Sequence, residues 1–266
     1  MVPGVCHRGA VSTDLDLATH LEGLRAAMVA LVRCADRAGL RAPVPTTPDW
    51  SVRRLVAHQG MVHRWAAAVV TGADQAPDRW QREGLEAPDP LEWLRDGAIE
   101  VVGAISAAPD DLDALVFLAD APPPRRFWAR RQCHETTIHA VDALAACLGR
   151  HPVAADADWV TEEVALDGID ELLTGFLPRP VSRLRSEEGR RIAVRPEGGS
   201  GGWLVELSAA PPVTSRFDGE TPDADLELTG SAVALYLTLW NRSDEASPDD
   251  GRGWDDWRDS AQVRWS

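Results

Sequence analysis

Residues 127–148 read FWARRQCHETTIHAVDALAACL, and Gly149 and Pro152 follow closely after them. A long run of this kind, ended by residues that do not continue a helix, predicts a helix over about 127–148. Within that helix, Glu135 and His139 are four positions apart. At about 3.6 residues per turn, the two side chains project from one face, one turn apart, so both can reach one ion.

Helical periodicity extends over most of the first two-thirds of the chain. Apolar residues recur at spacings of three and four, and they predict further helices over about 14–39, 51–70, 89–107 and 156–176. We expect Ser51 to cap the second of these helices, with Gly72 just beyond its end. Four principal amphipathic helices joined by loops are typical of a helical bundle.

The pattern changes near residue 190. Two short alternating runs, RRIAVRP at 190–196 and GWLVELSA at 202–209, are separated by a glycine-rich turn, which predicts a hairpin. Another strand is expected in DADLELTG at 223–230, and SAVALYLTLWNR at 231–242 returns to helical spacing. The predicted fold is therefore mainly α, with a bundle domain over 1–178 followed by a small α+β domain over 190–266.

Composition and charge exclude several classes of protein. The formal net charge is −15, which argues against a nucleic-acid partner because such affinity comes from clustered basic residues. No apolar stretch is long enough for a membrane span, and the N-terminal residues have no apolar core of a signal peptide. We therefore expect a cytoplasmic protein with no membrane partner.

Arginine and cysteine usage adds two further expectations. All 27 basic residues are Arg, which excludes chemistry that needs a Lys amine and suggests a GC-rich, actinobacterial genome. The cysteines are scattered without a CxxC pair and are expected to be reduced thiols. They are Cys6, Cys34, Cys133 and Cys147.

A third candidate metal ligand is His58, which stands among apolar residues in the predicted helix 51–70. Together with Glu135 and His139 from a facing helix, it could hold one divalent ion and leave a coordination position open, as catalytic zinc sites do. Taken alone, a histidine on an amphipathic helix is more often a core or surface residue. A Glu–His pair at this spacing is likewise more often a solvated pair.

The string from His134 to His139 also invites comparison with zinc proteases. That motif needs two histidines four positions apart, whereas these two are five apart and are rotated by about 140° from each other. The protease interpretation therefore fails on spacing.

Three motifs resemble those of the mycothiol-dependent maleylpyruvate isomerase family. They are WSVRRLVAH at 50–58, ETTIHAVD at 135–142, and ADLELTG with LYLTLWNR at 224–242. The resemblance extends from about 15 to 245. It implies a DinB-like four-helix bundle, zinc or another divalent metal on His58, Glu135 and His139, and mycothiol as thiol cofactor. Asp142 matches an acidic position of the family and is expected to support the site.

The resemblance also implies a reaction class. A metal-bound thiolate would attack a small electrophile, either in S-transfer or in cis–trans isomerisation of a maleylpyruvate-like substrate. An anionic electrophile calls for arginine, which meets a carboxylate with two parallel hydrogen bonds. Arg242 matches a position at which the family supplies an arginine, although it could equally be a surface residue. Arg131 could face the site or could only pair with Glu135 or Glu162.

Two alternatives remain open from the sequence. An open zinc position also permits hydrolysis by metal-bound water. A non-catalytic metal-binding module would use the same bundle, and it would bind metal without thiol-dependent turnover.

Overall fold

The computed structural model describes residues 15–248 and 254–262, and the chain divides into two compact units. The bundle unit comprises Leu15–Phe117 and Ala121–Val164. The sheet unit comprises Leu118–Asp120 and the chain from Ala165 on. The division thus falls within one helix, and the domain limits expected from the sequence stay a prediction.

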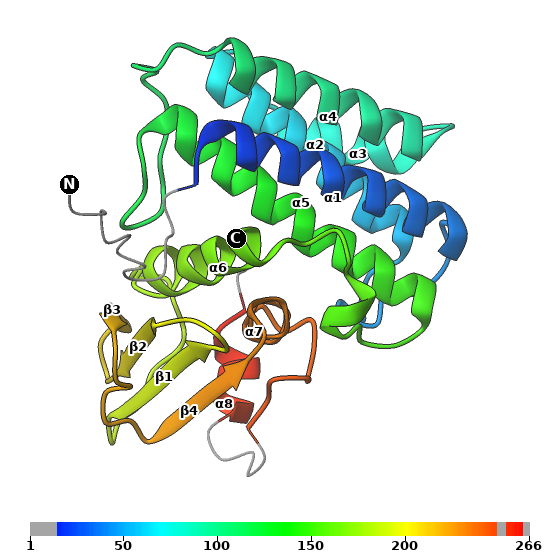
Figure 1. The fold of residues 1–266 in the computed structure, drawn as a ribbon. Helices are drawn as coiled ribbons and strands as arrows, with labels where there is room; N and C mark the ends of the chain where they lie inside the picture. Colours follow the sequence, from blue (N-terminus) through cyan, green and yellow to red (C-terminus); the bar gives the residue numbers. More distant parts are fainter. Residues whose placement is uncertain (1–14, 249–253, 263–266) are drawn as a thin grey trace, which may run out of the picture. The chain divides into compact units, whose positions relative to one another are not determined.

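The bundle unit is built from four long helices and a shorter one (Figure 1). The helices are α1 (Leu17–Ala38), α2 (Val52–Thr71), α3 (Pro77–Glu86), α4 (Pro90–Ala107) and α5 (Pro124–Leu148). Helix α1 packs mainly on α5, and α2 packs on α4, α3 and α5. The four long helices confirm the predicted bundle.

Local sequence explains where the long helices begin and end. Asp16 accepts a hydrogen bond from the backbone N–H of Thr19, and Ser51 caps α2 as predicted. Gly72 and Gly149 end α2 and α5 with φ of 69°, in the left-handed region that glycine adopts without steric cost.

Helix α3 was not predicted, because its sequence PDRWQREGLE is mostly polar and only Gly84 is buried. It packs closely all the same. The indole of Trp93 lies where side chains on Gly60 and Gly84 would stand, so the two glycines make room for it between α2, α3 and α4. The indole can approach the two helices this closely only because glycine has no Cβ, and such a contact produces no periodic pattern in the sequence.

Helix α5 is buried on nearly every side from Phe127 to Ala145. Its buried positions include six ionisable side chains. Because burying an uncompensated charge is costly, these side chains must pair with one another or bind an ion or ligand. They are Arg130, Arg131, His134, Glu135, His139 and Asp142. Helix α5 thus concentrates buried ionisable side chains in the bundle unit.

The sheet unit begins inside α6 (Glu162–Asp170), which starts later than the predicted 156 and continues as a π-helical segment, Glu171–Phe176. Its remaining elements are β1 (Arg190–Pro196), β2 (Gly201–Leu207), β3 (Val213–Asp218), β4 (Leu226–Gly230), α7 (Ala232–Leu239) and α8 (Trp254–Ser260). The strand order is β3-β2-β1-β4. Strands β1 and β2 form the predicted antiparallel hairpin, and β4 pairs with β1 in parallel.

Strand β3 was not expected, because it is an edge strand whose residues are largely exposed. It is tied to the unit by Arg216, whose Nε and Nη2 lie 2.6 and 2.7 Å from the two oxygens of buried Asp170. Trp203 donates to the same carboxylate at 2.8 Å. The hydrogen bonds to Asp170 raise the pKa of Arg216, although its partial burial acts to lower that pKa.

Across the described residues, no helix has the length and apolar character needed to cross a membrane.

Candidate metal centre

The three predicted ligands come together inside the bundle unit. His58 lies on α2, and Glu135 and His139 lie one turn apart on α5. Glu135 Oε1 is 3.3 Å from His139 Nε2 and 3.7 Å from His58 Nε2. One ligand atom from each residue lies within 4.8 Å of the other two. The spacing argument from the sequence thus corresponds to a real convergence in space.

These distances fit a divalent metal. Two donors bound to zinc at tetrahedral angles stand roughly 3.3 Å apart, given bond lengths of about 2.0–2.1 Å. Glu135 Oε1 is buried and accepts no hydrogen bond from a described residue, although two imidazoles face it. A buried carboxylate oxygen in that state is suited to a cation, and His₂Glu is a ligand set that catalytic zinc uses.

His139 is oriented from behind by a carboxylate. Its Nδ1 lies 2.8 Å from Oδ2 of Asp142, which is fully buried. The other oxygen, Oδ1, accepts a 2.6 Å hydrogen bond from Thr46 in the loop between α1 and α2. A neutral imidazole whose Nδ1–H is held by a carboxylate can present its Nε2 lone pair to a cation, an arrangement common behind metal-bound histidines. Asp142 thus contacts a candidate ligand directly, and its role at the centre stays a prediction.

Glu135 is oriented in the same way by a buried arginine. Arg131 is 1% exposed, and its Nη2 donates to Glu135 Oε2 at 3.0 Å. One carboxylate oxygen is thereby held, and the other faces the two imidazoles. Of the two roles that the sequence left open for Arg131, the structure contains the pairing with Glu135.

The pKa values of the triad follow from this packing. Burial would raise the pKa of Glu135, but the facing His139 and His58 and the charge of Arg131 hold it well below its usual range. Burial would lower the pKa of His139, yet Asp142 and Glu135 raise it to about 9. Burial lowers the pKa of His58, with Glu135 opposing that effect. The triad thus contains a firmly ionised carboxylate between two imidazoles.

An aromatic side chain lies against both histidines. The indole of Trp50 stacks on His139 at 5.9 Å and 19°, and it meets the ring of His58 edge-on at 4.9 Å. The guanidinium of Arg54 lies 5.3 Å from the centre of the same indole. Neither residue was singled out from the sequence. For Arg54 a signal existed, because it precedes His58 by four positions on α2 and shares its face.

A second buried polar group lies next to the triad. His63 Nε2 is 2.8 Å from Gln59 Nε2 and 3.0 Å from the hydroxyl of Thr136, which neighbours Glu135 in sequence. Burial lowers the pKa of His63 to about 3. His63 is thus neutral at physiological pH, and it links α2 to α5 beneath the candidate ligands.

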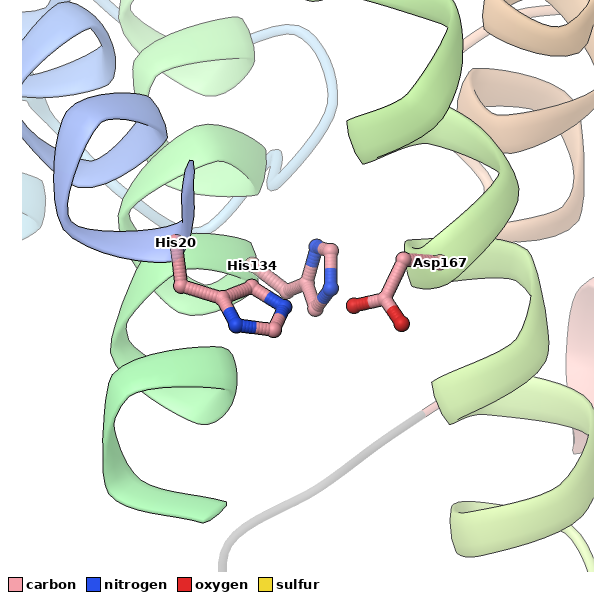
Figure 2. Close-up of side chains that lie close together, drawn as sticks. All are labelled: His20, His134 and Asp167. Atoms are coloured by element: carbon pink, nitrogen blue, oxygen red, sulfur yellow. The ribbon is translucent and has the colours of Figure 1, made fainter. Parts of the chain in front are cut away.

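His134 belongs to a different surface of α5, as its five-residue spacing from His139 requires. Its ring meets that of His20 from α1 at 6.1 Å, nearly perpendicular (Figure 2). Asp167, also labelled in Figure 2, belongs to the sheet unit. The structure therefore agrees with the rejection of a zinc-protease motif.

Arg242 lies in the sheet unit just after α7. Its Nη1 donates to the backbone carbonyl of Trp240 at 2.8 Å, and its side chain is half-buried. A role for Arg242 at the candidate metal centre stays a prediction.

The fold and the converging side chains define a class of protein: a DinB-like helical bundle followed by a small α+β unit. Two family models match the chain in that order. The mycothiol maleylpyruvate isomerase N-terminal domain matches residues 21–144, and the C-terminal domain of the same family matches residues 163–263. The chain belongs to the mycothiol-dependent maleylpyruvate isomerase family, which is a family of enzymes.

Two crystal structures are similar over most of the chain. One is a mutant of the mycothiol-dependent maleylpyruvate isomerase, at a TM-score of 0.60 and 16% identity, covering 90% of this chain and 95% of that one. The other is the mycothiol-dependent maleylpyruvate isomerase itself, at 0.57 and 16%, covering 88% and 92%. At this identity the likeness concerns the fold. No curated protein matches the chain.

Proposed function

We propose that this chain is a mycothiol-dependent metalloenzyme. His58, Glu135 and His139 would hold a divalent metal, zinc, beside which the thiol of mycothiol reacts with a small electrophile. The observation that carries the proposal is the approach of two imidazole Nε2 atoms, at 3.7 and 3.3 Å, to one carboxylate oxygen that accepts no hydrogen bond from the described residues.

The cofactors supply the reactive groups. Zinc, when bound, lowers the pKa of a nearby thiol so that it loses its proton near neutral pH. Mycothiol, when bound, supplies a sulfur nucleophile for either S-transfer or cis–trans isomerisation of a maleylpyruvate-like substrate.

The chain itself prepares the ligands. Asp142 holds the proton of His139 on Nδ1, and Arg131 holds Oε2 of Glu135, so that Nε2 and Oε1 face the same point. Because these partners are buried, the ligand atoms need little rearrangement when the cation arrives. The indole of Trp50 covers the two imidazoles and limits access of water to them.

The electrophile is proposed to be a small anion, with Arg242 as a partner for its carboxylate. Arg131 is proposed to support a ligand, because it is buried against Glu135 and is not placed to meet substrate.

The hydrolase alternative needs a carboxylate that is free to act as a base. Both acids at the centre are engaged, Glu135 by Arg131 and Asp142 by His139 and Thr46. This arrangement favours a thiol nucleophile over an activated water.

Turnover of maleylpyruvate and of a panel of electrophiles, with and without mycothiol, tests the proposal. We expect thiol-dependent turnover that is lost in His139→Ala and kept in His151→Ala, a matched exposed histidine of the bundle unit. Metal binding without thiol-dependent turnover would favour a non-catalytic module. Turnover that ignores mycothiol would favour the hydrolase.

A second readout follows the sulfur directly. Titration of the cobalt-substituted protein with mycothiol is expected to change the visible spectrum, because a new sulfur ligand alters the ligand field of the ion. A spectrum that does not respond to saturating thiol would contradict the proposed open position.

A further inference from the structure

We propose that Arg54, stacked on Trp50, is a carboxylate-binding residue of the bundle unit that recognises the electrophile. This inference rests on the proposed function and deepens it, because it names a residue that would recognise the anionic group of the substrate. The sequence-based candidates for anion binding were Arg131 and Arg242, and the inference adds a third residue on a different helix.

Arg54 lies on the same face of α2 as His58, one helical turn before it. It lies in the first turn of α2, where its own backbone N–H is capped by Ser51. The positive end of the helix dipole adds to the attraction for an anion at this end of α2.

Trp50 links the arginine to the candidate ligands. Its indole is in contact with the rings of His58 and His139, and the guanidinium of Arg54 lies 5.3 Å from the indole centre. Stacking on an aromatic ring restrains a guanidinium and leaves its N–H edge available for a carboxylate.

Other arginines around α2 and α5 are already engaged. Arg53 donates to the carbonyls of Leu85 and Ala87, and Arg131 is paired with Glu135. Arg54 is exposed, and its guanidinium makes no hydrogen bond or ion pair with a described residue. An exposed, uncommitted guanidinium next to the triad is the feature that a carboxylate ligand would need.

Direct binding tests the inference without turnover. Maleate, a planar dianion, and its uncharged diamide are titrated calorimetrically into the zinc-loaded protein. We expect Arg54→Gln to weaken maleate binding about tenfold or more, because a charge-assisted hydrogen bond is lost, and to leave the diamide unchanged. Arg54→Lys, which keeps the charge without the planar fork, should recover part of the affinity.

The matched control is Arg37→Gln, an exposed arginine of α1. It should bind maleate as the wild-type protein does. Equal maleate affinity in Arg54→Gln and wild type would overturn the inference, and so would an equal loss in Arg37→Gln, which would indicate a general effect of net charge. The metal content of Arg54→Gln should stay at the wild-type level, since Arg54 is not a ligand.

Kinetics separate the electrophile from the thiol as the source of the anion. At saturating mycothiol, Arg54→Gln should lower kcat/KM for an anionic electrophile and not for a neutral maleimide, with KM for the thiol unchanged. A raised KM for mycothiol with both electrophiles would overturn the assignment. If the wild-type protein shows no thiol-dependent turnover, the proposed function fails, while Arg54-dependent maleate binding would still stand.

Discussion

The hydroxyl of Thr46 donates to Oδ1 of Asp142 at 2.6 Å, across 96 positions of sequence. The other oxygen of Asp142, Oδ2, lies 2.8 Å from Nδ1 of His139. A loop residue thus fixes the buried carboxylate that orients a candidate ligand. Through this chain of hydrogen bonds, the loop between α1 and α2 contributes to the centre from behind, while Trp50 of the same loop covers it.

Replacing Thr46 by Val is expected to weaken metal binding by up to about tenfold, at the lower end of the effect of removing a partner of a ligating histidine, because Thr46 acts only through Asp142. The fold should persist, because valine has nearly the same shape. Competition with a chelator of known affinity measures the change. Thr47→Val, in the same loop, is the control and should bind metal as the wild type does. Equal affinity in the two variants would show that the Thr46 contact has no part in the centre.

Replacing Arg131 by Met should destabilise the metal-free protein by about 3 kcal/mol, at the lower end of the cost of breaking a buried ion pair. The loss stays at that end because His139, whose pKa is raised to about 9, still faces the carboxylate as a cation at neutral pH. Denaturant unfolding measures the change.

A double replacement serves as the control for that experiment. Arg131→Met combined with Glu135→Met removes both charges, so it should recover most of the lost stability and still bind no metal. A double variant that is as unstable as the single one would mean that Arg131 acts through packing and not through Glu135.

His63 should make stability depend on pH. Burial lowers its pKa from 6.5 to about 3, so between these values the unfolded chain binds a proton that the folded chain does not. The free energy of unfolding therefore falls as the pH drops from 6.5 toward 3, by at most about 1.4 kcal/mol per pH unit for this group. His63→Gln, measured by denaturant unfolding at several pH values, should show a shallower decline. Identical slopes would contradict the assignment.

Gly60 and Gly103 are expected to respond to Ala in opposite directions. A Cβ on Gly60 would meet the indole of Trp93, which is lodged between helices, so Gly60→Ala should cost about 1–3 kcal/mol through overpacking. A Cβ on Gly103 meets nothing, so Gly103→Ala should stabilise α4 by about 0.5–1 kcal/mol. Thermal and denaturant unfolding compare the two. A tolerated Gly60→Ala would refute the packing described around Trp93.

Helices α1, α2 and α4 could be predicted because their apolar residues follow the helical period, and Ser51, Gly72 and Gly149 mark the ends of α2 and α5. Helix α3 and strand β3 could not, since one is a polar surface helix and the other is a largely exposed edge strand. Elements of that kind are stabilised by what they pack against, and a local pattern does not record those partners.

The relative geometry of Glu135 and His139 could be predicted from their spacing on one helix, whereas their selection as candidate ligands depended on the family resemblance. His58 needed the further assumption that α2 packs against α5, which the resemblance supplied. Thr46 and Trp50 come from a loop whose path is set by tertiary contacts, including the bridge between Pro43 and Ser51. No periodicity in the sequence indicates where such side chains point.

Location of the metal itself tests the central claim most directly. In crystals of the zinc-loaded protein, anomalous diffraction at the zinc edge should give a peak about 2.0–2.2 Å from Nε2 of His58, Nε2 of His139 and Oε1 of Glu135. A zinc peak bound away from these three atoms, or zinc-loaded crystals with no peak beside them, would contradict the account.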